Sequence, residues 1–330
     1  MRSAGSAAPE RGGGEGETAA RGEMRDEVIA GLAEAQKTIS SKYFYDERGS
    51  RLFERITRLP EYYPTRAEQA LLDEHIPGWE REMRPRALVE LGAGNAEKTR
   101  TVIDAMLAAS GNAVYVPVDV SEDFLHETTR MLEEEYPTLR VAPAVSDISR
   151  EFRLPPLPHP VLHAFLGSTI GNFTEAEAVR MLTRIADVMQ LGDRLLLGVD
   201  LNDKPREVIE AAYNDAEGVT AEFNLNILSV INRELGADFR PEDFEHRAIW
   251  VDAASRIEMH LVARRDLTVT IPGGGPIRFR EGEHVRTEIS GKFDRATIDR
   301  MLHAAGLEVA RWAVHPAHAY ALLLARPIRA

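Results

Sequence analysis

Short apolar runs alternate with segments of helical periodicity through the middle of the chain. The runs are typical of buried strands, and in most of the segments after them apolar residues recur every three or four positions. Such alternation indicates a parallel sheet with crossover helices, so we expect an α/β fold. The predicted strands are Ala87–Leu91, Ala113–Val118, Leu139–Pro143, Val161–Leu166 and Arg194–Val199, with helices at Lys98–Ala109, Ser121–Glu135 and after Thr174.

The pattern differs on both sides of this region. Residues 1–23 hold almost no large apolar side chain, which predicts a disordered tail, and an amphipathic helix is expected over Asp26–Thr38. After Asp200 the chain changes to helices followed by alternating strands, with Gly273–Gly275 as a hairpin loop. The predicted elements are helices at Lys204–Asp215, Ala221–Leu235 and Arg295–Ala305, and strands within Arg247–Arg264, Leu267–Phe279, Glu308–Val314 and Tyr320–Ala325.

Composition excludes several classes of function. The 330 residues include no cysteine, so disulfides, thiolate zinc sites and cysteine nucleophiles are excluded, and a reducing cytoplasm fits. A net charge of −13 argues against a nucleic-acid partner, and no apolar run is long enough to span a membrane. No metal is expected, since His315-x-x-His318 is interrupted by Pro316 and lacks a carboxylate partner. We expect a cytoplasmic monomer, because no long exposed apolar stripe is evident.

The first predicted strand runs into a glycine turn and then a helix. Gly92 and Gly94 permit close approach of a ligand to the backbone, and the helix start offers N–H groups to a negative charge. Glu97 stands where the dinucleotide fingerprint has its third glycine, which argues against an NAD-dependent oxidoreductase. Glu90 followed by Leu-Gly-x-Gly looks like the first motif of S-adenosylmethionine-dependent methyltransferases, although an ordinary turn would show similar glycines.

Other candidate ligand residues follow the next strands. Asp119 ends the second strand, where a carboxylate accepts hydrogen bonds from ribose hydroxyls; as the alternative, it stabilises a helix N-terminus. Asp147 ends the third strand and suits the adenine amino group, or is a plain turn aspartate. Lys98 suits the cofactor carboxylate, or is an exposed helix lysine.

Nine segments in order resemble the L-histidine N-alpha-methyltransferases of ergothioneine biosynthesis. The resemblance extends from about residue 24 to the end of the chain. The segments are Lys42-Tyr-Phe-Tyr-Asp46, Gly49-Ser50, Thr57-Arg-Leu-Pro-Glu-Tyr-Tyr-Pro-Thr-Arg66, Glu90-Leu-Gly-x-Gly-x-x-Glu-Lys-Thr99, Phe165-Leu-Gly-Ser-Thr-Ile-Gly-Asn172, Gly218-Val-Thr-Ala, Phe223-Asn, Asn232-Arg-Glu-Leu235 and Thr287-Glu-x-Ser-x-Lys-Phe293.

The resemblance implies a Rossmann-like class I methyltransferase sheet with an inserted α+β substrate-binding domain. Residues 66–200 and 291–330 would bind S-adenosylmethionine, the methyl donor, and residues 24–65 and 201–290 would form a substrate-binding lid. The cofactor contacts implied are Gly92, Gly94, Lys98, Asp119, Asp147, Ile148 and Gly167, with Ile148 standing where members often carry an aromatic residue. The substrate contacts implied are Tyr62, Asn172, Tyr213, Met259, Glu288 and Ser290.

The chemistry of L-histidine agrees with these residue types. Asn172 and the Tyr213 hydroxyl suit the carboxylate and amine end as hydrogen-bonding groups. Glu288 and Ser290, two positions apart on one strand face, can hold the imidazole N–H. The rings of Tyr45 and Tyr62 suit a methylated ammonium, although aromatic clusters more often belong to a core, as does Met259. Without the resemblance, Glu288 would be interpreted as a solvated strand charge.

The expected reaction is three successive methylations of the α-amino group of L-histidine to give hercynine. Methyl transfer from a sulfonium needs mainly positioning, so no dedicated catalytic base is expected, and Tyr45, Asn172 and Gly167 are the positioning residues. Two alternatives stay open at this stage. In the first, the same fold serves another amino acid such as tryptophan. In the second, the protein binds S-adenosylmethionine without turnover.

Overall fold

The computed structural model describes residues 14–94, 96–119, 122–146 and 154–328. By compactness these residues form two units. The smaller unit holds the chain up to Ser50 together with Ala221–Arg247 and Met259–Glu288, and the larger unit holds Arg51–Thr220, Ala248–Glu258 and the chain from Ile289. The sequence-based division placed 51–65, 201–220, 248–258 and 289–290 with the lid, whereas by compactness they group with the larger unit. A lid role for any segment stays a prediction.

The larger unit is built on one mixed sheet. Neighbouring strands β7, β6, β2, β3 and β4 are parallel, while β14 pairs antiparallel with both β7 and β13. The α/β fold with a parallel core and a C-terminal hairpin is therefore confirmed. In spatial order the strands are β13 (Leu307–Val314), β14 (Tyr320–Pro327), β7 (Arg194–Asp200), β6 (Val161–Phe165), β2 (Ala87–Leu91), β3 (Ala113–Asp119) and β4 (Leu139–Val141), with β5 (Ala144–Val145) also on β3.

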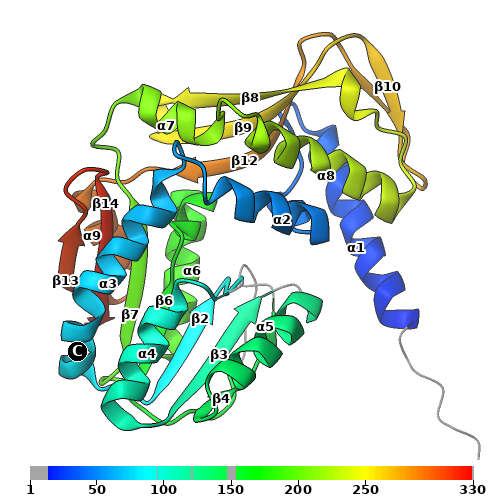
Figure 1. Cartoon of the computed structure of the whole chain (residues 1–330). Coiled ribbons are helices and arrows are strands. Elements are labelled where there is room, and N and C mark those ends of the chain that lie inside the picture. Colours follow the sequence, from blue (N-terminus) through cyan, green and yellow to red (C-terminus); the bar gives the residue numbers. More distant parts are fainter. Residues whose placement is uncertain (1–13, 95, 120–121, 147–153, 329–330) are drawn as a thin grey trace, which may run out of the picture. The chain divides into compact units, whose positions relative to one another are not determined.

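Helices cover both faces of this sheet (Figure 1). Side chains alternate along a strand, so Val89 of β2 packs in one core with helices α6 and α9, while Leu88 packs in the other with α3 and α4. Burial on both faces explains why the strands are continuous apolar runs rather than alternating ones. The helices are α2 (Glu47–Ile56), α3 (Tyr63–Met83), α4 (Thr99–Ser110), α5 (Glu122–Glu135), α6 (Glu175–Val188), α7 (Arg206–Tyr213) and α9 (Arg295–Ala304), with 3₁₀ turns at Thr169–Asn172 and Asp252–Ala254.

The smaller unit combines two helices with short strands. A four-stranded sheet has the order β1, β12, β9, β8, and β10 pairs antiparallel with β11 around the predicted glycine hairpin loop. The division between the two units falls inside β8, β9 and β12. The elements are α1 (Gly14–Ala33), β1 (Lys37–Thr38), α8 (Val219–Leu235), β8 (Phe244–Val251), β9 (Arg256–Ala263), β10 (Leu267–Thr270), β11 (Pro276–Phe279) and β12 (His284–Gly291), with 3₁₀ turns at Ser41–Phe44 and Pro241–Asp243.

Several predicted boundaries differ from the structure. The first predicted helix ends at Ala33 rather than Thr38, and Lys37–Thr38 form strand β1. Helix α1 begins at Gly14, so residues 14–23 are helical where a disordered tail was predicted; alanine, glutamate and arginine favour helix even without an apolar face. The third strand is broken into β4 and β5, since Pro143 cannot donate to a ladder. Helix α7 begins at Arg206 because Pro205 occupies its N-cap. The predicted N-cap Ser121 and residues 1–13 lie outside the described residues.

Candidate active site

The glycine turn follows β2 as predicted. Gly92 and Gly94 have φ angles of +70° and +51°, which explains why glycine occupies both positions. Among the described residues, no atom beyond the chain neighbours would lie within 4 Å of a Cβ atom at either position, so these residues leave that side of the turn open. The Gly92 N–H donates to the Val118 carbonyl at 2.8 Å, and the Gly94 N–H donates to Asp119 Oδ2 at 3.3 Å. The structure thus brings Gly92, Gly94 and Asp119, three predicted cofactor residues, together.

Glu90 lies in β2, two residues before Gly92, and is buried. Its carboxylate accepts hydrogen bonds from Thr99 Oγ1 and Tyr115 OH, each at 2.5 Å, and so ties β2 to the start of α4 and to β3. Burial raises the pKa of Glu90 to about 7, against the hydrogen bonds from Thr99 and Tyr115 that lower it. The acid of the first motif therefore joins the strand before the turn to its two neighbouring elements.

Lys98 and Gly167 meet at a second buried carboxylate. Lys98 forms an ion pair with Glu68, which is fully buried and accepts hydrogen bonds from Tyr320 OH at 2.7 Å and the Gly167 N–H at 2.8 Å. The Lys98 ammonium, which was predicted to bind the cofactor carboxylate, forms its ion pair with Glu68 in this structure. A Cβ at Gly198 would collide with Glu68 Oε1, so that position requires glycine. Sequence reasoning missed Glu68, although a carboxylate among the apolar positions of a helix was an available signal.

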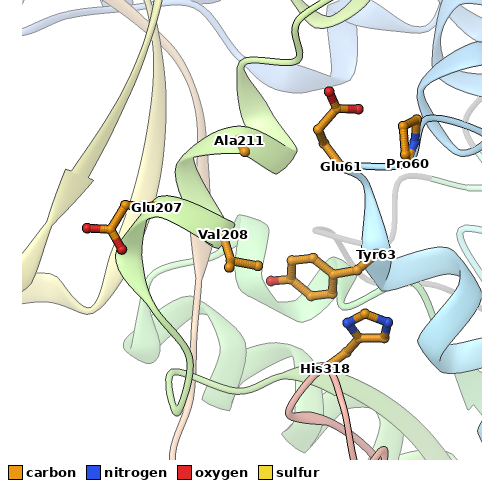
Figure 2. A pocket seen from close by; sticks show the side chains of 7 residues that line it. All are labelled: Pro60, Glu61, Tyr63, Glu207, Val208, Ala211 and His318. Carbon is orange, nitrogen blue, oxygen red and sulfur yellow. The ribbon is translucent and has the colours of Figure 1, made fainter.

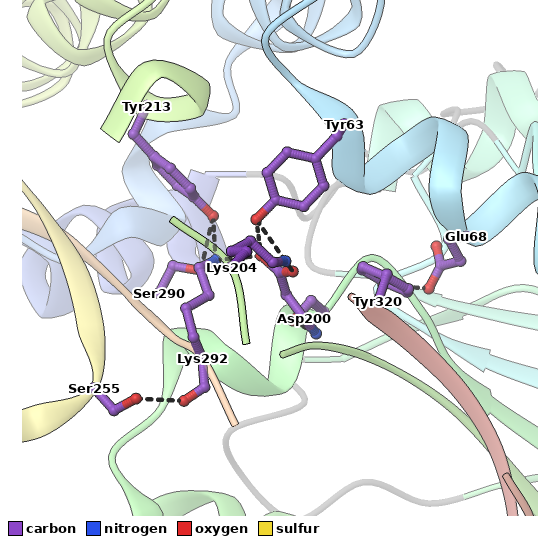
Figure 3. A network of polar contacts seen from close by, with 10 residues as sticks. Tyr63, Glu68, Asp200, Lys204, Tyr213, Ser255, Ser290, Lys292 and Tyr320 are labelled. Carbon is purple, nitrogen blue, oxygen red and sulfur yellow. Dashed lines mark hydrogen bonds and ion pairs between the residues drawn. The ribbon is translucent and has the colours of Figure 1, made fainter. Parts of the chain in front are cut away.

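Asp200, at the end of β7, is the centre of a third polar group, drawn in Figure 3. Its fully buried carboxylate accepts a hydrogen bond from Tyr63 OH at 2.6 Å and forms ion pairs with Lys204 and Lys292. Burial and the adjacent charge of Asp200 raise the pKa of Tyr63, so this hydroxyl stays protonated. Burial lowers the pKa of Lys204 to about 8, with Asp200 opposing that shift. Sequence reasoning did not assign Asp200, Lys204 or Lys292 to the site.

Two predicted substrate residues join this group. Tyr213 OH donates to Ser290 Oγ at 2.8 Å, and Lys292 Nζ lies 3.0 Å from the former oxygen and 2.9 Å from the latter (Figure 3). The Tyr62 ring lies edge-on to the Tyr213 ring, with centroids 6.2 Å apart. Tyr62, Tyr213 and Ser290 are therefore neighbours in the larger unit.

Asn172 ends a 3₁₀ turn that packs beside the same segment. A Cβ on its neighbour Gly171 would come 2.8 Å from the Gly291 carbonyl and 3.5 Å from Ser290 Oγ. Only glycine at position 171 lets these two backbone segments come so close. The residue next to Asn172 therefore packs directly against residues 290–291.

The remaining predicted residues belong to the smaller unit or lie outside the described residues. The Tyr45 ring packs edge-on against Phe223 at 5.8 Å and is 40% exposed, and Met259 is buried. Glu288 is half-buried in β12, two positions before Ser290. Their place in the substrate pocket stays a prediction. Asp147 and Ile148 are not among the described residues.

A cavity of about 320 Å³ opens beside Tyr63 (Figure 2). The Tyr63 ring stacks on His318, with centroids 5.6 Å apart, so this cavity adjoins the Asp200 group through the tyrosine. None of the predicted substrate residues lines it. Its lining consists of Pro60, Glu61, Tyr63, Glu207, Val208, Ala211 and His318.

The candidate residues gather where neighbouring parallel strands end. Gly92 follows β2, Asp119 ends β3, Gly167 follows β6 and Asp200 ends β7. The carboxyl edge of a parallel sheet is where α/β proteins bind nucleotide-like ligands. Within the described residues, no group of three or more His, Asp or Glu side chains is arranged to hold a metal. None of the described helices is long and apolar enough to cross a membrane.

The model of one protein family, the histidine-specific S-adenosylmethionine-dependent methyltransferases, matches residues 24–327. The chain belongs to this family. It is 41% identical over 319 residues to the histidine N-alpha-methyltransferase of Mycobacterium tuberculosis (strain CDC 1551 / Oshkosh), with 94% of this chain and 97% of the relative covered. It is 42% identical over 305 residues to the enzyme of that name from Mycolicibacterium smegmatis, with 92% and 94% covered.

A solved structure supports the fold of this methyltransferase. An S-adenosylmethionine-dependent methyltransferase from Clostridium acetobutylicum ATCC 824 superposes with a TM-score of 0.50 at 11% identity, covering 84% of this chain and 99% of the other. The sequence-based predictions of family, fold class and cofactor are thereby confirmed. The individual site residues stay predictions.

Proposed function

We propose that this methyltransferase transfers three methyl groups from S-adenosylmethionine to the α-amino group of L-histidine, giving hercynine in the first step of ergothioneine biosynthesis. The observation that carries the proposal is the match to the histidine-specific family over residues 24–327. The close grouping of Tyr62, Tyr213 and Ser290 supports it from the structure.

The residues at the carboxyl ends of β2, β3 and β6 suit the cofactor. The open side of the Gly92–Gly94 turn admits the amino-acid part, and Asp119 accepts hydrogen bonds from ribose hydroxyls. Lys98, shared with Glu68, offers its charge to the cofactor carboxylate. The bound sulfonium supplies an electrophilic methyl group.

The substrate residues act by positioning. Tyr213 and Asn172 hold the carboxylate and amine end of the amino acid by hydrogen bonds. Glu288 and Ser290 hold the imidazole N–H, Met259 lines the pocket, and the rings of Tyr45 and Tyr62 receive the methylated ammonium. Holding an uncharged amine in line with the methyl group supplies most of the rate enhancement, so no dedicated base is required. We propose that Asp147 and Ile148 contact the adenine part of the cofactor.

Mass spectrometry of the protein incubated with S-adenosylmethionine and an equimolar mixture of the twenty amino acids tests the proposal. We expect histidine alone to gain three methyl groups. Methylation of another amino acid, such as tryptophan, would refute histidine as the substrate and retain the proposed methyl transfer. Binding of S-adenosylmethionine without any methylation would favour a sensor. That the protein acts in the cytoplasm as a monomer also stays a proposal. Light scattering after gel filtration measures its mass and so tests whether it is a monomer.

A further inference from the structure

The side chain of Asn224 in α8 is the centre of a polar cluster in the smaller unit. It contacts three strands of the four-stranded sheet. Its Nδ2 lies 3.1 Å from the His260 carbonyl of β9 and 2.8 Å from His246 Nδ1 of β8. Its Oδ1 lies 2.6 Å from Thr287 Oγ1 of β12. Asn224 and Thr287 are 0% and 2% exposed, so these contacts lie away from solvent.

The direction of each hydrogen bond in this cluster is fixed. A backbone carbonyl only accepts, so the amide atom that faces the His260 carbonyl is the donor Nδ2 of Asn224. The second N–H of the amide donates to His246 Nδ1, which accepts in the neutral tautomer that carries its proton on Nε2. Oδ1 accepts the single hydroxyl proton of Thr287, because the Met259 carbonyl is farther from that hydroxyl, at 3.1 Å. Both donors and the acceptor of the amide are therefore used.

Such a cluster specifies position more than it adds stability. Replacing both partners of a buried hydrogen bond by apolar groups of the same shape is often nearly neutral, so stability alone does not require the polar pair. A fully paired buried network, in contrast, admits only one arrangement of its members. If β12 shifted by one residue, Thr287 would move away from Asn224 and the amide oxygen would lose its donor. The Asn224–Thr287 hydrogen bond therefore fixes the register of β12 against α8.

Glu288 follows Thr287 directly in β12. Successive side chains of a strand leave from opposite faces, so Thr287 faces α8 and the half-buried Glu288 leaves from the other face. Neighbouring Cα atoms are about 3.8 Å apart, so an anchored Thr287 also fixes the point from which the Glu288 carboxylate reaches out. A shift by one residue would turn Glu288 toward α8.

We propose that Asn224 and Thr287 are positioning residues that hold the Glu288 carboxylate where it accepts a hydrogen bond from the imidazole N–H of the substrate. The proposal deepens the proposed function and rests on it for the identity of the substrate as histidine. Neither Asn224 nor Thr287 touches the substrate. Their effect passes through the backbone of β12 to Glu288, so it disappears when residue 288 carries no carboxylate.

The kcat/KM for L-histidine, measured by mass spectrometry of the methylated product at saturating S-adenosylmethionine, tests this coupling. Thr287→Val keeps the shape of the side chain and removes the hydroxyl. We expect it to lower kcat/KM about tenfold, the order of one weakened hydrogen bond to a charged group. In a Glu288→Ala background the same Thr287→Val change should alter kcat/KM by less than about twofold, because the group that it positions is gone. Thr287→Ser, which restores the hydroxyl, should recover most of the loss.

Thr268→Val is the matched control. It makes the same change at an exposed position of β10 in the same unit and should leave kcat/KM within about twofold of wild type. A loss by the same factor in Thr287→Val with and without the Glu288 carboxylate would overturn the proposal, because a residue that only stabilises the fold acts independently of Glu288. Wild-type kcat/KM in a folded Thr287→Val variant would overturn it as well.

A second variant keeps the outcome decisive. If Thr287→Val does not fold by circular dichroism, the double variant Asn224→Leu/Thr287→Val replaces it, since removing both partners leaves neither polar atom facing an apolar one. Its kcat/KM is compared with and without Glu288→Ala in the same way. Failure of the wild-type protein to methylate histidine would refute the proposed function itself. Methylation by the wild type, with losses that do not depend on Glu288, would refute only the role of Asn224 and Thr287.

Discussion

Replacing Glu68 by glutamine should weaken the larger unit measurably. The Glu68 carboxylate is fully buried. Its Oε1 accepts a hydrogen bond from Tyr320 OH, and the Gly167 N–H donates to both of its oxygens. A hydrogen bond to a charged acceptor is worth about 1 kcal/mol more than one to a neutral acceptor, which gives about 2 kcal/mol for the two donors. Loss of the Lys98 ion pair adds about 1 kcal/mol at most, because the Lys98 side chain is 22% exposed and can return to solvent. The sum is about 2 to 3 kcal/mol.

Urea unfolding followed by circular dichroism at pH 7 measures this loss. Glu74→Gln is the matched control on the same helix α3, since the Glu74 side chain is 72% exposed and the change should stay within about 0.5 kcal/mol. Equal unfolding midpoints for the Glu68 and Glu74 variants would refute the reasoning that the Glu68 carboxylate organises this part of the fold.

Three other perturbations address the site. Asp119→Ala should weaken S-adenosylhomocysteine binding by about tenfold or more, measured by calorimetry, because a ribose acceptor is lost; unchanged affinity would remove Asp119 from the cofactor site. Tyr213→Phe should raise the histidine KM strongly and leave the cofactor affinity near wild type, and steady-state kinetics with both unchanged would contradict the pocket. Because Glu90 has a raised pKa of about 7 against 4.5 for an unperturbed carboxyl, the folded state binds the extra proton between these values. Wild type should therefore lose stability relative to Glu90→Gln as pH rises from about 4.5 to 7; parallel urea midpoints across that range would show that Glu90 is not buried as described.

Local pattern determined the elements that carry the site. The apolar runs at β2, β3, β6 and β7 predict buried parallel strands because two covered faces leave no polar side to alternate with. The glycine turn after β2 was predictable because the positive φ of Gly92 is a local requirement. Because neighbouring strands are parallel, their carboxyl ends lie at the same edge of the sheet. The ligand residues that follow these strands therefore group at that edge. Sequence resemblance supplied Tyr213 and Ser290 as substrate residues, which no periodicity contains, and only the structure showed that they are hydrogen-bonded to each other.

Tertiary packing decided which buried charges meet. Glu68 and Tyr320 are 252 positions apart, and Tyr213 and Lys292 are 79 apart, so nothing local in the chain relates them. The partner of Lys98 also came from the fold, since an exposed-looking helix lysine proved to pair with the fully buried Glu68. A buried ion must find its counter-charge wherever the packed layers bring one within reach, and that distance exists only after the sheet and its helices have assembled. The sequence by itself therefore determined the scaffold and the location of the site, and only the folded structure decided the network of Glu68, Asp200 and Lys292 that supports it.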